Sequence, residues 1–142
     1  MTDDEFLHQF ETRTFPLDQW HHRAHVKVAY LYVQRFGLDI AAGKLRDGIR
    51  AYNAANQIKD TPTSGYHETM TQAWLRIIHT TLQEYGPGAT ADEFFDAHPQ
   101  LGQKKILRLF YSVEVFMSPR AKREFIEPDL TRLPEKHKNL SK

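Results

Sequence analysis

The chain has 142 residues, of which 40% are hydrophobic and 26% are charged, a composition that fits one globular domain and excludes an intrinsically disordered protein. Its 19 Lys and Arg residues are interspersed with 18 Asp and Glu residues, so we expect no nucleic-acid partner and no membrane partner. Because the chain has no cysteine, disulfides and thiolate sites are excluded, and any metal must be bound through nitrogen and oxygen.

Three of the first five residues are acidic, whereas a secretory signal begins with basic residues. No stretch approaches the roughly 20 apolar residues that a membrane-spanning helix needs. The sequence therefore predicts a cytoplasmic protein.

Apolar residues recur at helical spacing along most of the chain, and no segment shows the alternation of a strand. Breakers and capping residues separate the helices. In chain order the predicted helices cover 4–11, 19–37 with Asp18 as N-cap, 39–56, 66–85, 91–97 with Thr90 as N-cap, 103–117, and 119–125 with Ser118 as N-cap.

This pattern predicts an all-α protein, a compact irregular helical bundle of about five to seven helices with an extended C-terminal tail. Residues 1–134 are expected to form a single helical domain. Residues 135–142 are expected to form a frayed tail, because they are charged and follow a proline.

Three of the eight histidines, His21, His22 and His25, fall within five consecutive residues in the second predicted helix. The apolar stripe through Phe36 and Val33, continued backwards by threes and fours, reaches His25 and His22. We therefore expect His22 and His25 to flank the buried face and His21 to lie at its rim. Two imidazoles three residues apart on one helix are able to share a metal ion.

A second cluster, His67 and Glu68, opens the fourth predicted helix. Counting back from Ile78 and Trp74 places Thr71 and His67 toward the core, with Glu68 about 100° further around the helix. At both helix starts the backbone dipole favours neutral imidazole, which is the form that binds metal.

Aromatic residues precede both clusters. Trp20 comes just before the first and Tyr66 just before the second, so we expect them, together with Thr71, to line a ligand site. The alternative is that these aromatic rings are simply part of the core, which is the usual role of aromatics at helical spacing.

Helices that alternate in direction place the starts of the second and fourth helices at the same end of a bundle. If these helices are neighbours, His22, His25 and His67 supply three nitrogens to one zinc or ferrous ion. Glu68 is then a fourth ligand or a general base. The leading hypothesis is a mononuclear metal site, in a metal-dependent enzyme that acts on a small molecule.

Other interpretations of these residues stay open. Glu68 fits a capping box with Gly65 as N-cap, and the first cluster fits a solvated rim with one hydrogen-bonded core histidine. His67 and Glu68 also fit a metal-free acid/base pair. The alternative to an enzyme is a non-enzymatic helical module that binds a small anion or a protein partner at the same helix starts.

Two motifs carry a resemblance to a family of small uncharacterised bacterial proteins. They are W-x-H-x-x-H, over Trp20 to His25, and G-Y-H-E-T, over Gly65 to Thr69. The resemblance covers most of the chain and singles out the matched positions His22, His25, His67 and Glu68. It implies a bacterial, all-helical protein and no particular activity.

Overall fold

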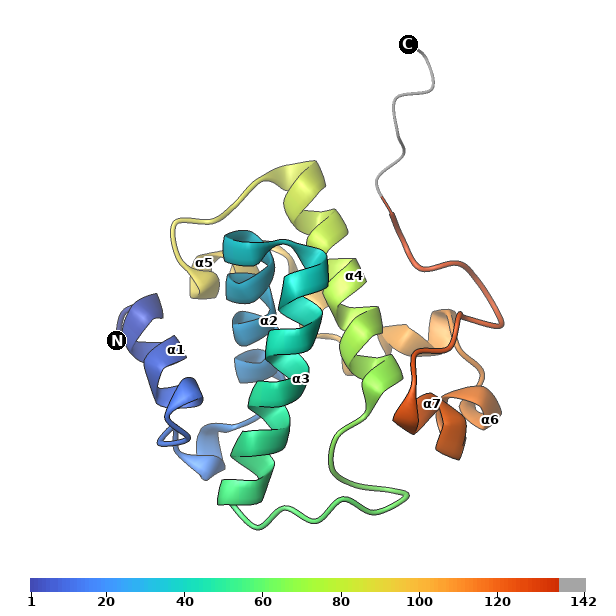
Figure 1. Ribbon diagram of the computed structural model, residues 1–142. Helices are drawn as coiled ribbons and strands as arrows, with labels where there is room; N and C mark the ends of the chain where they lie inside the picture. Colours follow the sequence, from blue (N-terminus) through green and yellow to red (C-terminus); the bar gives the residue numbers. More distant parts are fainter. Residues whose placement is uncertain (136–142) are drawn as a thin grey trace.

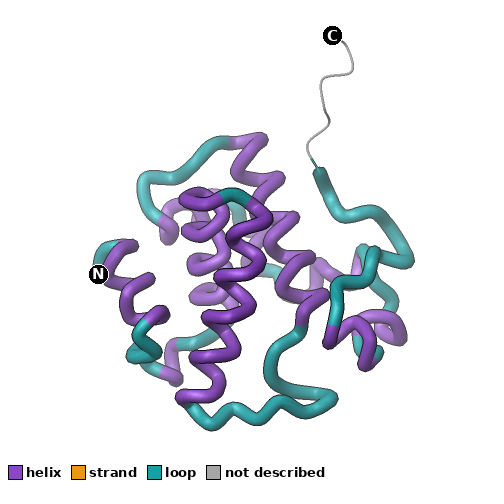
Figure 2. Tube along the Cα trace, viewed as in Figure 1, coloured by secondary structure: helices purple, strands orange, loops and turns teal. Residues whose placement is uncertain are grey.

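The computed structural model describes residues 1–135, and the all-α prediction is confirmed over that range (Figures 1 and 2). The predicted frayed tail lies outside the described residues, apart from Glu135. The α-helices are α1 (Asp3–Glu11), α2 (His22–Phe36), α3 (Leu38–Ala55), α4 (Glu68–Tyr85), α5 (Ala91–Ala97), α6 (Val113–Phe116) and α7 (Pro119–Arg123). The 3₁₀-helices are η1 (Leu17–Gln19), η2 (Pro99–Gly102) and η3 (Lys104–Leu109).

Helix α2 is the centre of the bundle. It contacts α1, α3, α4 and α5, and the stretch Val28 to Val33 is buried without interruption. The sequence predicted one apolar stripe, whereas a helix that is apolar on nearly all sides is one surrounded by others. Phe36, which was assigned to that stripe, is 43% exposed at the helix end.

The start of α2 differs from the prediction. Asp18 does not cap a long helix, because residues 17–19 form η1 and the chain turns once more before α2 begins at His22. The N-cap is His21, whose side chain makes no capping hydrogen bond. The turn buries Trp20, whose ring stacks on Phe10 of α1 at a centroid distance of 5.1 Å.

The continuous helix predicted over 103–117 is wrong, because the segment splits into η3 and α6. Between them the backbone N–H of Ser112 donates to the Asp129 carboxylate at 2.8 Å, and the Tyr111 hydroxyl donates to the Ile126 carbonyl at 2.7 Å. The bond from Ser112, together with one that the Leu130 N–H donates to the Phe110 carbonyl at 2.9 Å, takes the place of helical backbone hydrogen bonds. The predicted cap at Ser118 is confirmed, since its hydroxyl accepts from Ala121 N at the start of α7.

The short helices α6 and α7 lie beside the N-terminal half of α4 (Figure 1), and α7 contacts α4 directly. Helices of four and five residues do not hold themselves together, so tertiary contacts must stabilise them. One such contact joins Thr69 of α4 to the end of α7, where its hydroxyl donates to the Glu124 carbonyl at 2.8 Å.

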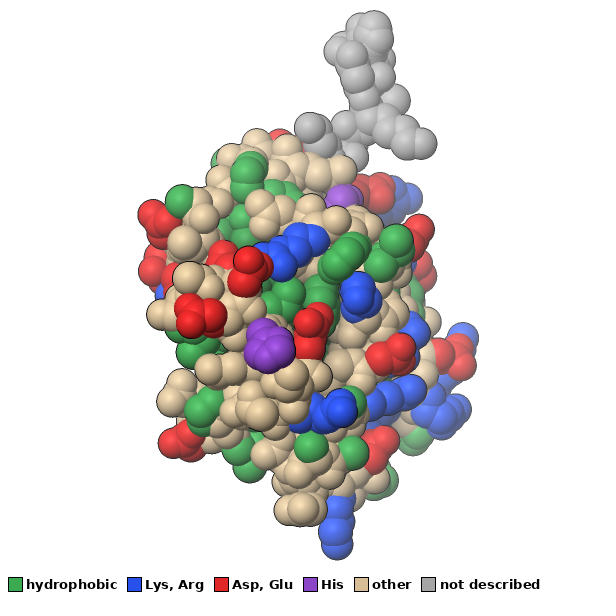
Figure 3. Space-filling model, turned by 60° about the vertical axis from the view of Figure 1, so that its left-hand side comes forward, with side chains coloured by type: hydrophobic (Ala, Val, Ile, Leu, Met, Phe, Trp, Pro, Cys, Tyr) green, Lys and Arg blue, Asp and Glu red, His purple; other side chains and the backbone are tan. Residues whose placement is uncertain are grey.

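No helix within residues 1–135 is long and apolar enough to cross a membrane. The face in Figure 3 carries acidic and basic side chains intermingled, as the balanced composition predicts.

Candidate ligand-binding site

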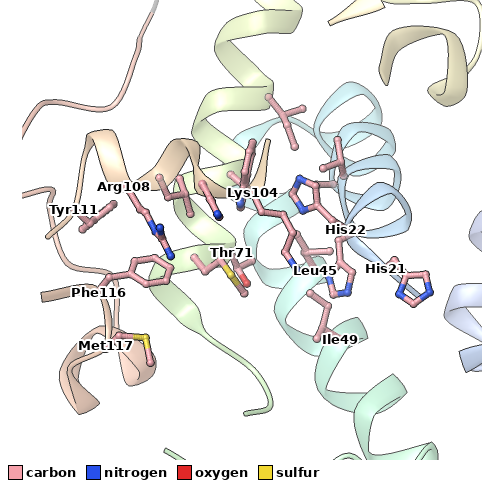
Figure 4. Close-up of a pocket in the computed structure, with 18 of the residues that line it drawn as sticks. His21, His22, Leu45, Ile49, Thr71, Lys104, Arg108, Tyr111, Phe116 and Met117 are labelled. Carbon is pink, nitrogen blue, oxygen red and sulfur yellow. The ribbon is translucent and has the colours of Figure 1, made fainter. Parts of the chain in front are cut away.

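A pocket of about 710 Å³ opens between the starts of α2 and α4 on one side and the η3–α6 segment on the other (Figure 4). Its volume lies within the range of small-molecule sites in proteins. Apolar side chains from α2, α3, α4 and α6 form most of the wall. The charged and polar residues that line it are His21, His22, His25, Thr71, Lys104, Lys105 and Arg108.

His22 is half-buried on the α2 wall. Its Nε2 lies 2.7 Å from the carbonyl oxygen of Leu101, and because a carbonyl only accepts, Nε2 must carry the proton. The ring also packs against Trp74 of α4 at 4.8 Å between centroids. Burial is the main cause that lowers the His22 pKa, the bond to Leu101 opposes the shift, and the charge of Lys104 adds to it.

His25 lies one helical turn further along the same wall. Its ring packs on Trp20 at a centroid distance of 4.0 Å. Burial lowers its pKa to about 4, and the nearby charges of His22, Lys104 and His21 act in the same direction. His25 is therefore a neutral imidazole at neutral pH, and no hydrogen bond to its side chain is present within residues 1–135.

Cations from η3 face these imidazoles. Lys104 and Lys105 follow one another, and Arg108 comes one turn later on the same pocket wall. In Figure 4 Lys104 lies between His22 and Arg108. None of these three cations takes part in a salt bridge within the described chain, and no Asp or Glu is among the residues that line the pocket there.

The start of α4 is built differently. His67 is its N-cap, and Nδ1 of the ring accepts from the backbone N–H of Met70 at 3.0 Å. Its Nε2 donates to the Phe116 carbonyl of α6 at 2.9 Å, and the two rings stack at 4.6 Å. Both ring nitrogens are thus engaged, so His67 has no free lone pair for a metal in this arrangement.

Glu68 is 4% exposed and faces α3. The Arg46 guanidinium donates two bonds to its carboxylate, at 2.8 and 2.7 Å. Tyr66 donates a third bond at 2.8 Å, and Gln72 donates a fourth at 2.5 Å. This is a fully satisfied buried ion pair.

The same partners determine how Glu68 titrates. Burial by itself raises the pKa of a carboxyl group, but the hydrogen bonds from Arg46, Gln72 and Tyr66 outweigh it, and the Glu68 pKa falls to about 2. Such a weakly basic carboxylate is poorly suited to act as a general base near neutral pH. The capping box with Gly65 as N-cap is wrong, because the N-cap is His67 and Glu68 is the first residue of α4.

The predicted site residues therefore fall into two groups. Trp20, His22, His25 and Thr71 all line the pocket, whereas Tyr66, His67 and Glu68 do not. Thr71 donates its hydroxyl to the His67 carbonyl at 2.9 Å, and Tyr66 donates to Glu68.

Helices α2 and α4 are neighbours, but His67 binds α6 and Glu68 binds α3, so neither joins His22 and His25 in the pocket. Within residues 1–135 no group of three or more His, Cys, Asp or Glu residues is arranged to hold a metal ion. The zinc or iron site therefore stays a prediction that this geometry does not support.

Sequence reasoning missed the three cations of η3. The signal was present, because residues 103–110 contain two lysines and an arginine at positions i, i+1 and i+4 with no acidic residue. A count over the whole chain hid this local excess of positive charge.

Comparisons with known protein families, with curated proteins and with solved structures gave no match for this chain. The resemblance carried by the two histidine motifs therefore stays a prediction. Function has to be argued from the pocket itself.

Proposed function

We propose that the protein is a binding module for a small organic anion, which it takes up in the pocket between α2, α4 and η3. The observation that carries the proposal is the charge of the lining. Lys104, Lys105 and Arg108 all line the pocket, across from His22 and His25, and none of the three has a carboxylate partner within residues 1–135.

Several basic side chains elsewhere in the structure form salt bridges with acids, whereas Lys44 and Arg50 of α3 lie over aromatic rings. Arg23, for example, binds Asp92 and Asp96, and Lys27 shares Asp92. Like charges gathered in a concave site raise the local potential and attract anions. A bound anion would relieve the mutual repulsion of the η3 cations, and the apolar walls around it would strengthen the attraction.

The imidazoles suit the same ligand. His25 is neutral and makes no other hydrogen bond within the described residues, so its ring is free to donate an N–H to an anion. We propose binding rather than catalysis because Glu68, the candidate general base, faces α3 instead of the pocket.

Tryptophan fluorescence tests the proposal directly, since the chain has two tryptophans, Trp20 and Trp74, and both line the pocket. Titration with benzoate should change the emission saturably, whereas its neutral counterpart benzamide should have much less effect. Added salt should weaken the benzoate response. Lys104→Gln should weaken it about threefold to fivefold, the effect of one partly exposed ion pair.

The matched control is Arg123→Gln, which removes an exposed cation that does not line the pocket. It should leave the affinity unchanged, and Lys104→Gln should keep the urea midpoint of the parent. Equal responses to benzoate and benzamide would contradict the proposal, as would equal effects of the two variants. Tight binding of zinc alone that is lost in His22→Ala would instead support the metal hypothesis.

A further inference from the structure

The wall of the pocket that lies nearest to α6 is apolar and continues into solvent. Met70 of α4, Val113 of α6 and Met117 just after α6 line the pocket, yet they are 37%, 60% and 53% exposed. We call these three residues the apolar rim. Exposed apolar side chains gathered around one opening are typical of a surface that a ligand covers.

The apolar rim lies across the pocket from the imidazoles. In Figure 4 Phe116 and Met117 are on the opposite side from His21 and His22, with Lys104 between them. The pocket thus has its imidazoles at the start of α2, and at α6 it has exposed apolar side chains with Arg108 beside them. Met70 and Met117 are unbranched and adaptable, so they are able to pack against chains of different shape.

We infer that the ligand is a single-chain amphiphile whose anionic head binds at Lys104, His22 and His25, and whose alkyl chain runs along Trp74 and over the apolar rim. The inference rests on the proposed function and adds the ligand class and its orientation. Arg108, an exposed residue that lines the pocket beside Phe116, lies next to the path of the chain, and its aliphatic stem is able to pack against that chain.

A homologous series of alkyl carboxylates tests the chain. Butanoate, hexanoate, octanoate and decanoate are titrated into the full-length protein below their micelle concentrations, with tryptophan fluorescence and calorimetry as readouts. Each methylene buried against the rim should tighten binding by up to about fourfold. Decanol, which has the chain without the charge, should bind more weakly than decanoate.

Paired variants test the two ends separately. Met117→Gln should flatten the dependence of affinity on chain length and leave butanoate binding unchanged. Leu109→Gln is the matched control, since Leu109 is 63% exposed and does not line the pocket. Lys104→Gln should weaken every member of the series by the same factor.

The outcomes separate this inference from the proposed function. If compact anions such as benzoate bind but affinity does not rise with chain length, the amphiphile is wrong and anion binding stands. If no anion binds, both the amphiphile inference and the proposed function are wrong. If Arg108→Gln weakens the series while Lys104→Gln does not, the orientation is reversed and the inference is overturned. Decyl phosphate, tested beside decanoate, shows which anionic head is preferred, and either preference supports an amphiphile.

Discussion

The two histidine-bearing helix starts look alike in sequence but are used differently in the fold. At the start of α2, His22 and His25 line an open pocket opposite cations that form no salt bridge within residues 1–135. At the start of α4, both polar side chains form hydrogen bonds within the protein. His67 binds α6, and Glu68 binds α3. Polar residues in a first turn therefore identify a binding site only when they face an open pocket, as His22 and His25 do.

The contrast also has an energetic side. The start of α4 joins α3, α6 and α7 through satisfied polar contacts, including one from Lys122 to the Tyr66 carbonyl at 2.7 Å. At the start of α2, His22 donates to the Leu101 carbonyl, but within residues 1–135 the His25 side chain makes no hydrogen bond and the facing cations form no salt bridge. We therefore expect changes at α4 to affect stability and changes at the pocket to affect binding.

The largest expected effect comes from Glu68→Ala. The change leaves the Arg46 guanidinium without its carboxylate and removes the acceptor for Tyr66 and Gln72. Because the Arg46 side chain is 33% exposed and keeps some access to water, the loss should be about 3 kcal/mol, at the lower end for a broken buried pair. Urea unfolding measures it.

The matched control is Glu84→Ala, an exposed acid in the last turn of α4 that should change stability by less than about 0.5 kcal/mol. If Glu68→Ala is as mild as this control, the ion pair does not stabilise the α4 start. The claim that the start of α4 stabilises the fold, in contrast to the start of α2, would then be wrong.

Lowering the pH should reduce the stability of the fold through His25 at the start of α2. The pKa of His25 in the folded state is about 4, below the ordinary histidine value of 6.5, so below pH 6.5 the unfolded chain binds a proton that the folded protein does not. Stability should be about 2 kcal/mol lower at pH 5 than at pH 7.5, with the loss levelling off below pH 4.

His22 and His67 have lowered pKa values for the same reason, burial, and add to the loss in the same direction. Glu68 acts in a lower window, between pH 4.5 and about 2, where its stabilising charge is lost as the pH falls. Urea unfolding at several pH values measures this. Between pH 7.5 and 5, the free energy of unfolding of His25→Gln should depend less on pH than that of the parent. The exposed His8→Gln should behave like the parent, and an unchanged slope in His25→Gln would show that His25 is not kept neutral by burial.

A smaller effect is expected at the cap of α4. His67→Ala removes the acceptor for Met70 N and the donor to the Phe116 carbonyl, at a cost of about 1 kcal/mol. His67→Asn should recover part of this loss, because asparagine is a good N-cap. His21→Ala should cost little, since the His21 side chain makes no capping bond at α2. Equal thermal shifts for His67→Ala and His21→Ala would contradict the difference between the two caps.

Some helix boundaries are predictable from the sequence and others are not. Periodicity and caps placed α3 and α5 to within a residue, because their signals are local. The split between η3 and α6 was not predictable in this way, since Asp129 and Leu130, further along the chain, bind backbone groups there and compete with helical bonds. The early start given to α2 failed for a similar reason, because the aromatic cluster around Trp20 holds η1 and a turn in place of its first helical residues.

For the site, the sequence by itself determined which residues of α2 face inward, because helical spacing separates His22 and His25 from His21. Only the tertiary structure decided what the start of α4 does. The partner of Glu68 comes from 22 residues earlier, and the carbonyl that engages His67 comes from 49 residues later. A first-turn side chain takes the nearest satisfying partner, and its spacing in sequence does not say which helix brings that partner close.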